Sequence, residues 1–461
     1  MHLSALVPLV LVLVAPLARE GAEWGIGHPR ATQPGGVKGL PPEISENWPG
    51  WRGPRGTGVS SETAFPVTWD TSNIRWKTPI PGRGHSSPVV WGNRIFLTTA
   101  IEGEVVPGRE EKPGHDVGGE IFIHPDMISH DRRQTLKVFA VDATSGAVVW
   151  ERTAYDGPVT DGRHRKSSFA SATPVTDGDV VIVNFGTEGL YAYDFAGELR
   201  WKVDLGEVRT LGLGYATSPV IRNGVVFVQC DEDIGERSFI AAFDAKTGRE
   251  MWRRSRPVQS SWASPVIVEH DAGGGRTGVQ LVTAGNEFTI AYEPETGAEL
   301  WRTKGVDSNA IPSPVYGNGM VYMTAGFPAK TVLAIKPAAN EPDIVWTYAR
   351  GTAYVTSPIL VGDILYLSTD RGIITALDAK TGEVIYEGGR VPVPATFTAS
   401  MVAFGDRILQ SSEDGDVFVI QAGRKHEVLT TNKLGEPIFA SPALADGVIY
   451  IRGEQHLYAI R

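Results

Sequence analysis

The sequence predicts an all-β fold, an eight-bladed β-propeller whose blades are four-stranded antiparallel sheets. Three observations lead to this prediction. A turn motif that ends in Gly and leads to an aromatic residue recurs along the chain. A hydroxyl residue followed by Pro opens a short β run at a spacing of about 44 residues, the period of a four-stranded repeat. Gly (53) and Pro (31) are frequent, as many tight turns require.

The turn motif has the form Ala-x-Asp-x-x-Thr-Gly-x-x-x-Trp, with looser copies in several repeats. Its Asp can accept hydrogen bonds from its own turn, and its Gly allows the left-handed conformation there. The aromatic residue then begins the next strand, and we expect it to pack between blades. The positions assigned to this structural motif are Asp142, Gly146, Trp150, Trp201, Asp244, Gly248, Trp252, Trp301, Trp346, Asp378 and Gly382.

The hydroxyl residues set the number of repeats. Pro can begin a strand because its missing N–H costs little there. After each hydroxyl position come a β run, a Gly, Asn or Asp turn and a second β run, which together predict a hairpin. The result is eight units with strands A, B, C and D, with the Asp-Thr-Gly turn between C and D. The hydroxyl positions are Ser87, Thr173, Ser218, Ser264, Ser313, Ser357, Ser400 and Ser441.

The last unit lacks a fourth strand, because the chain ends at Arg461 after three β runs. Upstream, Trp76 stands where the aromatic of a D strand is expected. We therefore predict that the N-terminal strand at residues 74–80 closes the last blade. Closure of this kind leaves no open sheet edge.

Three further regions are expected. Residues 1–20 contain an apolar run shorter than the roughly 20 residues of a membrane span, and they read as a signal peptide for export to the periplasm or the exterior. Residues 21–72 are predicted to be a linker and an irregular N-terminal segment, ahead of the propeller at 73–461. Residues 101–134 form an insertion in the first repeat.

Composition limits the partners. The net charge of −10 argues against sequence-independent binding to nucleic acid, and no run is long enough to span a membrane. The single cysteine, Cys230, ends an apolar strand, so we expect a buried structural thiol and no intramolecular disulfide. We expect a monomer.

The repeated turns resemble the tryptophan-docking motif of PQQ-like (quinoprotein) eight-bladed propellers, over residues of about 73–461. This family includes quinoprotein alcohol dehydrogenases and the BamB-type outer-membrane assembly protein. The Trp-Pro-x-Trp-Arg-Gly-Pro stretch at 48–54 is similar to the opening of secreted PQQ-like propellers of unassigned activity.

The resemblance implies two functions. The first is a non-catalytic scaffold that binds a protein or another envelope component, with no cofactor. The alternative is a divergent alcohol or sugar dehydrogenase using PQQ with Ca²⁺. The dehydrogenases use two adjacent cysteines at the cofactor, and the BamB-type protein is anchored through a cysteine near its start; Cys230 alone supplies neither. We therefore expect the scaffold and no catalytic residues.

Binding is expected on the face that carries the B–C turns and the D–A connections. The basic run Arg163–Lys166 lies there, and an Arg side chain can hold a carboxylate in a fork. The other reading of each residue is packing at the top of strand A or, for the basic run, a solvated loop. The candidates for a ligand or partner site are His85, His164, Arg165, Tyr215 and Trp262.

The insertion carries three histidines, His115, His124 and His130, each near a carboxylate. Imidazole and carboxylate are ligands for transition metals, so these are weak candidates for a metal site. Their spacing matches no closed metal motif, and a solvated lid or docking loop is the leading expectation. Turn chemistry accounts for the acidic runs 231–233 and 413–416.

Overall fold

The computed structural model describes residues 47–109, 111–117, 119–233, 235–271, 276–307 and 309–461. These residues belong to one compact unit, Leu40–Arg461. The predicted signal peptide and the predicted linker up to residue 46 lie outside the described residues.

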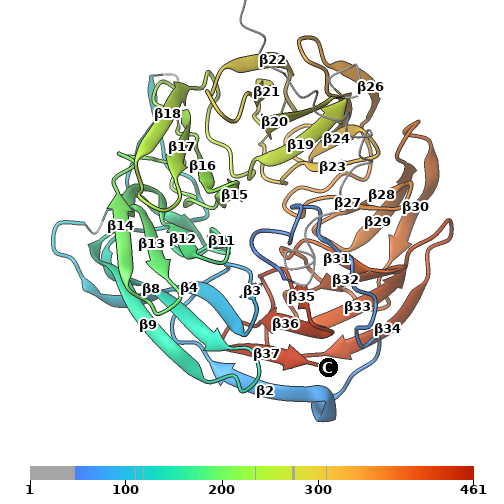
Figure 1. Cartoon of the computed structure of the whole chain (residues 1–461), viewed down its shortest axis with the longest axis horizontal. Coiled ribbons are helices and arrows are strands. Elements are labelled where there is room, and N and C mark those ends of the chain that lie inside the picture. The colour runs from blue at the N-terminus through green and yellow to red at the C-terminus, as the bar shows by residue number, and fades with distance from the viewer. Residues whose placement is uncertain (1–46, 110, 118, 234, 272–275, 308) are drawn as a thin grey trace, which may run out of the picture. The chain divides into compact units, whose positions relative to one another are not determined.

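Eight blades, each with four antiparallel strands, follow one another around a centre, which confirms the predicted eight-bladed propeller (Figure 1). In each blade, strand A lies nearest the centre and strand D at the rim. The first four blades are β3 (Val89–Trp91), β4 (Arg94–Val105), β8 (Arg132–Asp142) and β9 (Val148–Pro158); β11 (Val175–Thr176), β12 (Val180–Asn184), β13 (Leu190–Asp194) and β14 (Leu199–Val203); β15 (Val220–Arg222), β16 (Val225–Cys230), β17 (Phe239–Asp244) and β18 (Glu250–Ser255); and β19 (Val266–Asp271), β20 (Thr277–Thr283), β21 (Phe288–Tyr292) and β22 (Glu299–Lys304).

The remaining blades repeat this order. The described residues also include two short 3₁₀ helices, η1 (Thr71–Asn73) and η2 (Gly186–Glu188). Blades five to eight are β23 (Val315–Gly317), β24 (Met320–Ala325), β25 (Thr331–Lys336) and β26 (Asp343–Tyr348); β27 (Ile359–Val361), β28 (Ile364–Ser368), β29 (Ile373–Asp378) and β30 (Val384–Arg390); β31 (Val402–Phe404), β32 (Arg407–Ser411), β33 (Asp416–Gln421) and β34 (Val428–Lys433); and β35 (Ala443–Ala445), β36 (Val448–Arg452), β37 (His456–Ile460) and β2 (Ile74–Pro79).

The N-terminal strand closes the last blade as predicted. Strand β2 pairs antiparallel with β37, with Trp76 opposite Ala459. The blade therefore joins strands from the two ends of the described chain, and the edge of β37 is covered by β2 (Figure 1).

The segment before β2 runs along the inner strands. Trp48 is fully buried and pairs with Val90 of β3. The indole N–H of Trp51 donates to Ser313 Oγ of the fifth blade at 3.0 Å. Strand β1 (Val59–Ser60) then pairs in parallel with β31 of the seventh blade. One irregular segment thus contacts the first, fifth and seventh blades.

The recurring turns have the expected geometry. Asp142 Oδ1 accepts hydrogen bonds from the backbone N–H groups of Thr144 and Ser145, at 3.1 and 2.9 Å. Gly146 has φ 74°, a conformation that favours glycine. Asp244 and Asp378 accept equivalent bonds from Thr247 and Thr381, and the matching Gly248 and Gly382 have φ 71° and 74°.

Most of the motif tryptophans bond to the following blade. Trp150 donates from its indole N–H to Phe195 O, and Trp201, Trp252 and Trp346 do the same to Ala245, Pro294 and Ala379, all at 2.9–3.0 Å. Trp301 is the exception, because it donates to Gln280 Oε1 at 2.8 Å. The Gln280 amide in turn donates to Ala338 O of the fifth blade at 2.8 Å, so a side chain completes this contact.

The hydroxyl residues at the starts of the blades form a chain of hydrogen bonds around the centre. Each one after Ser87 accepts a bond from the backbone N–H of the equivalent residue one blade earlier, from Ser87 N–H to Thr173 Oγ1 through to Ser400 N–H to Ser441 Oγ. The seven bonds measure 2.9–3.0 Å. The acceptor in each bond is a side-chain hydroxyl oxygen. Ser and Thr carry such an oxygen close to the backbone, which explains why one of them recurs at this position.

Candidate functional site

The insertion in the first blade folds as short strands over the face that carries the D–A connections. Strands β5 (His115–Val117) and β6 (Glu120–Phe122) form a two-stranded hairpin. Strand β7 (Met127–Ile128) pairs with β10 (Arg163–His164), which lies between the first and second blades. The insertion is therefore tied to the connection that carries the basic run.

His115 fixes the base of the hairpin to the propeller. Its side chain is fully buried between Asp161, in the connection from the first to the second blade, and Asp233, in the B–C turn of the third blade. The ring atom Nδ1 makes a short contact with Asp233 Oδ2, and Nε2 lies 3.3 Å from Asp161 Oδ1. Arg209 adds a second tie by donating to Gly114 O at 2.7 Å.

The two carboxylates are held by one loop. Asp161 Oδ2 accepts from the backbone N–H groups of Thr210 and Gly212, at 2.8 and 3.3 Å. Between them, Leu211 N–H donates to Asp233 Oδ1. Successive backbone donors thus alternate between the two acids, which orients both toward His115.

This arrangement favours a protonated His115. Burial alone would lower the pKa of the imidazole, but the contacts with Asp161 and Asp233 outweigh burial and raise the pKa to about 9. The pKa of Asp161 is lowered despite its burial, because it contacts His115 and accepts backbone hydrogen bonds. At neutral pH the group is therefore a buried cation between two acids.

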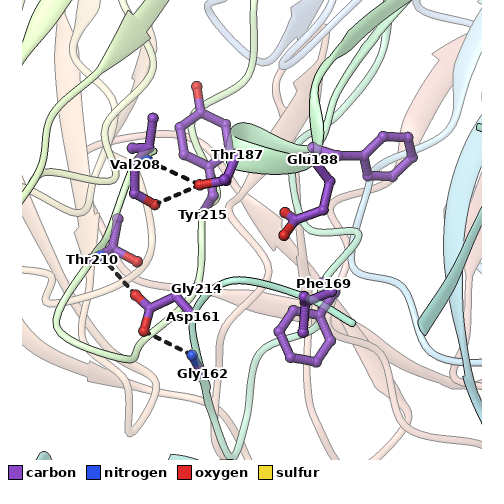
Figure 2. A pocket seen from close by; sticks show the side chains of 11 residues that line it. Asp161, Gly162, Phe169, Thr187, Glu188, Val208, Thr210, Gly214 and Tyr215 are labelled. Carbon is purple, nitrogen blue, oxygen red and sulfur yellow. Dashed lines mark hydrogen bonds between the residues drawn. The ribbon is translucent and has the colours of Figure 1, made fainter. Parts of the chain in front are cut away.

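A small cavity lies beside this ion pair (Figure 2). Asp161, Glu188 and Tyr215 are among the side chains around it, and Phe169 lies below Glu188 in the view. Its volume is about 20 Å³, which is room for about one water molecule and too small for an organic ligand. Burial raises the pKa of Glu188, so its carboxyl is less acidic than usual.

The second strand of the hairpin carries exposed apolar side chains. Ile121 and Phe122 lie on β6, with Phe122 opposite His115, and Ile123 follows the strand. These three side chains are 73, 40 and 48% exposed. Val117 and Ile128, elsewhere in the insertion, are also exposed. We call Ile121–Ile123 the apolar segment. Contiguous exposed apolar side chains on a rigid support mark interaction sites more often than isolated ones do.

The basic run is engaged with the insertion. Arg165 Nε donates to Asp126 Oδ1 at 2.7 Å, and His164 Nε2 lies 3.7 Å from the other oxygen of Asp126. The ring of His124 meets that of His164 edge-on, with centroids 6.2 Å apart. Lys166 reaches the seventh blade, where its Nζ lies 2.7 Å from Glu413 Oε2.

The other candidate residues from the sequence lie in separate places. The Tyr215 hydroxyl donates to Gln229 O and accepts from Asn184, both at 2.7 Å, so its polar atom is used between two blades. The indole N–H of Trp262 donates to Gly214 O at 2.9 Å. His85 stacks on Phe439, with ring centroids 4.7 Å apart.

The histidines of the insertion do not converge. His115 faces Asp161 and Asp233, His124 faces His164, and the pKa of His130 is lowered by burial and by Arg109. Within the described ranges, no group of three or more His, Cys, Asp or Glu side chains is placed to hold a metal ion.

The acidic run 231–233 is buried, which turn chemistry alone did not predict. Asp231 accepts from Arg256 Nε at 2.7 Å, and both side chains are fully buried between the third and fourth blades. Cys230 is buried as expected, and burial raises the pKa of its thiol to about 12. A charged residue directly after an apolar strand was the only pattern in the sequence that marked Asp231.

Comparison with known proteins agrees with this architecture. A family model described as outer membrane protein assembly factor BamB, a PQQ-like repeat model, matches residues 134–269 and 236–461. The chain belongs to this PQQ-like propeller family. Within the described residues, no helix has the length and apolar character that crossing a membrane requires.

Two curated relatives of this propeller cover different shares of it. Outer membrane protein assembly factor BamB of Burkholderia pseudomallei is 29% identical over 110 residues, 23% of this chain and 28% of that protein. Tetrathionate hydrolase of Acidithiobacillus ferrooxidans is 27% identical over 349 residues, 71% of this chain and 58% of that protein. The chain thus spans less than two thirds of the length of either relative.

Solved structures share the fold at low identity. Quinohemoprotein alcohol dehydrogenase from Comamonas testosteroni has a TM-score of 0.57 at 14% identity, covering 90% of this chain and 80% of that one. BamB from Moraxella catarrhalis has a TM-score of 0.50 at 14% identity, covering 70 and 91%. These likenesses concern the fold alone.

Proposed function

We propose that this PQQ-like propeller is an exported, non-catalytic scaffold that binds a partner protein through the apolar segment of its insertion. The observation that carries the proposal is the combination of exposed Ile121, Phe122 and Ile123 with the buried His115, which pairs with Phe122 in the same hairpin. An apolar segment on a fixed support loses little conformational freedom on binding.

The hairpin favours an extended partner segment. Strands β5 and β6 form a sheet of two strands only, so each has an edge without a further strand among the described residues. An extended polypeptide can pair with such an edge while its side chains pack on Ile121 and Ile123. The printed name of the family model, an assembly factor, supports a protein as the partner.

The test replaces the apolar segment while leaving its support intact. We expect Ile121→Asp/Ile123→Asp to lose capture of a partner from the envelope fraction of the native organism, measured by cross-linking and mass spectrometry. Leu199→Asp on β14 is the control, because Leu199 is also exposed, at 53%, but lies in another blade. Equal capture by both variants and the unaltered protein would rule out the apolar segment as the docking surface.

The alternative is a PQQ-dependent dehydrogenase acting on alcohols or sugars, and it rests on the family and the fold. The residues described do not fit the cofactor set that the family implies. Cys230 has no second cysteine beside it, and no described cluster of acids and histidines is placed to hold calcium. Incubation with PQQ and Ca²⁺ distinguishes the two functions, since a bound-quinone spectrum with dye reduction by an alcohol would support the dehydrogenase.

A further inference from the structure

Three arginines meet around His85 on the face that carries the D–A connections. Arg83 lies in the connection from β2 to β3, Arg163 lies in β10, and Arg452 ends β36. Burial lowers the pKa of the His85 imidazole, and the positive charges of all three arginines lower it further. We call Arg83, Arg163 and Arg452 the arginine cluster.

The arginine cluster has no acidic partner among the described residues. Arg83 donates to Arg165 O at 3.2 Å, and its Nε is buried without a hydrogen-bond partner. Arg163 donates to Ser167 O at 3.1 Å, and Arg452 donates to Ser86 Oγ at 2.9 Å. All three acceptors are neutral oxygens, so the charges remain uncompensated.

The nearby acids are engaged elsewhere. Glu413 is 2.7 Å from Lys166 Nζ, and Asp126 is 2.7 Å from Arg165 Nε. The negative charge of Glu102 acts on Arg163, but Glu102 Oε1 is paired with Arg132 Nε at 3.3 Å. Arg163 therefore differs from Arg165 and Lys166 in the same basic run, whose charges are paired.

Aromatic rings hold the guanidinium groups in place. The Phe439 ring carries His85 on its face, with nearly parallel planes (11°), and lies 5.7 Å from the Arg83 guanidinium carbon. Arg163 lies 5.8 Å from the centre of the Phe169 ring. Cation–π contacts position a cation without neutralising it.

Uncompensated charge in this setting is unfavourable. Burial lowers the pKa of Arg452 to about 9, and burial and the charge of Arg83 lower the pKa of Arg163. A bound anion would reverse both effects by supplying opposite charge to fixed donors. Guanidinium groups match the planar or tetrahedral oxygens of oxyanions better than a point charge does.

We propose that the arginine cluster and His85 form a binding site for a small oxyanion of the sulfate, phosphate or carboxylate class. This site is separate from the apolar segment, so it can be occupied whether or not a protein binds there. Arg83 and Arg163 are its accessible donors, because both are only partly buried, whereas Arg452 is buried.

The experiment measures thermal unfolding of the full chain during titration with sodium sulfate, phosphate or acetate up to about 20 mM, with ionic strength held constant by sodium chloride. For the unaltered protein we expect a saturable rise in Tm of roughly 2–4 °C for at least one oxyanion. We expect Arg83→Gln and Arg163→Gln to weaken the apparent affinity at least tenfold. Arg253→Gln is the control, because Arg253 is paired with Glu250 on β18 at 2.8 Å.

Two outcomes would overturn the proposal. One is a linear rise of equal slope in all four proteins, which is the general effect of an excluded salt. The other is the absence of any shift relative to chloride. If Arg163→Gln folds poorly by circular dichroism, Arg163→Lys keeps the charge but loses the fork, and titration calorimetry on that variant should still show weaker binding of the oxyanion.

Discussion

His115 is one side chain that decides where an insertion of about thirty residues lies. It is buried between two carboxylates that are 72 residues apart in the chain, Asp161 and Asp233. Removing one member of a buried ion pair leaves the others uncompensated, at a cost of about 3–5 kcal/mol.

We predict that His115→Ala releases the hairpin without unfolding the blades. Limited proteolysis should then cut within residues 105–131 at least tenfold faster, while the thermal transition of the propeller changes little. His124→Ala is the matched control, because this histidine belongs to the same insertion and is only partly buried. Unchanged proteolysis of His115→Ala would contradict the anchoring role.

The same residue predicts a pH dependence. Its pKa is raised in the folded protein, to about 9 from 6.5. A raised pKa means that the stabilisation is complete below about pH 6.5 and is lost as the pH rises through about 9. Proteolysis of the insertion should therefore accelerate between pH 7 and pH 10 relative to a His115→Gln variant, whose ratio of insertion cleavage to total cleavage should stay flat.

At the residue scale, the sequence singled out individual side chains better than it predicted which residues they contact. His115 was singled out, but as a weak metal candidate, because spacing along the chain says nothing of Asp161 and Asp233. For Tyr215 and Trp262 the sequence left two readings open, packing or a ligand or partner site. Their hydrogen bonds to Gln229 and Gly214 fit the packing reading. The arginine cluster was missed, since its members come from segments up to 369 residues apart.

At the scale of elements, the strands and turns follow from local chemistry. The Asp of each such turn accepts hydrogen bonds from the backbone of its own turn, as Asp142 does from Thr144 and Ser145, so the sequence predicts these turns well. The fifth blade departs from the motif between β25 and β26, and there Gln280 replaces the missing contact by bridging Trp301 and Ala338. The Gln280 side chain thus joins the fourth and fifth blades. The sequence of a single repeat does not reveal this contact, because it involves residues of two blades.

We predict that Gln280→Leu destabilises the protein by about 1–3 kcal/mol, because it leaves the indole N–H of Trp301 and the Ala338 carbonyl without partners. Equilibrium unfolding in urea measures the loss. Thr303→Val on β22 is the control, because this half-buried side chain does not bridge the two blades. A loss no larger than that of the control would show that water replaces the amide.

At the scale of the whole molecule, the closed ring was predictable from two features of the sequence. The repeats give the number of blades, and the last repeat lacks a fourth strand that the N-terminal strand can supply. The pairing of β2 with β37 followed from a single tryptophan at the right phase. The path of residues 47–60 was not predictable. It depends on where three blades stand relative to one another, and that arrangement exists only after the ring has formed.

The segment that crosses the inner strands should contribute to global stability. We predict that Trp48→Ala lowers the free energy of unfolding by about 3–5 kcal/mol, since Trp48 is fully buried against Val90. Trp91→Ala, on β3 and only partly buried, should cost clearly less. If both variants lose the same free energy of unfolding in urea, the segment around Trp48 contributes no more to stability than a partly buried side chain of a blade does.

The chain of hydroxyl hydrogen bonds around the centre has a beginning and an end. It starts at the Ser87 N–H and finishes at Ser441, and Ser87 Oγ has no partner among the described residues. The first and last blades are joined there instead by Arg452, which donates to Ser86 and Thr98, and by the stack of His85 on Phe439. An oxyanion held by Arg83 and Arg163 would add a contact beside this joint, so its occupancy would raise the force needed to pull the propeller open.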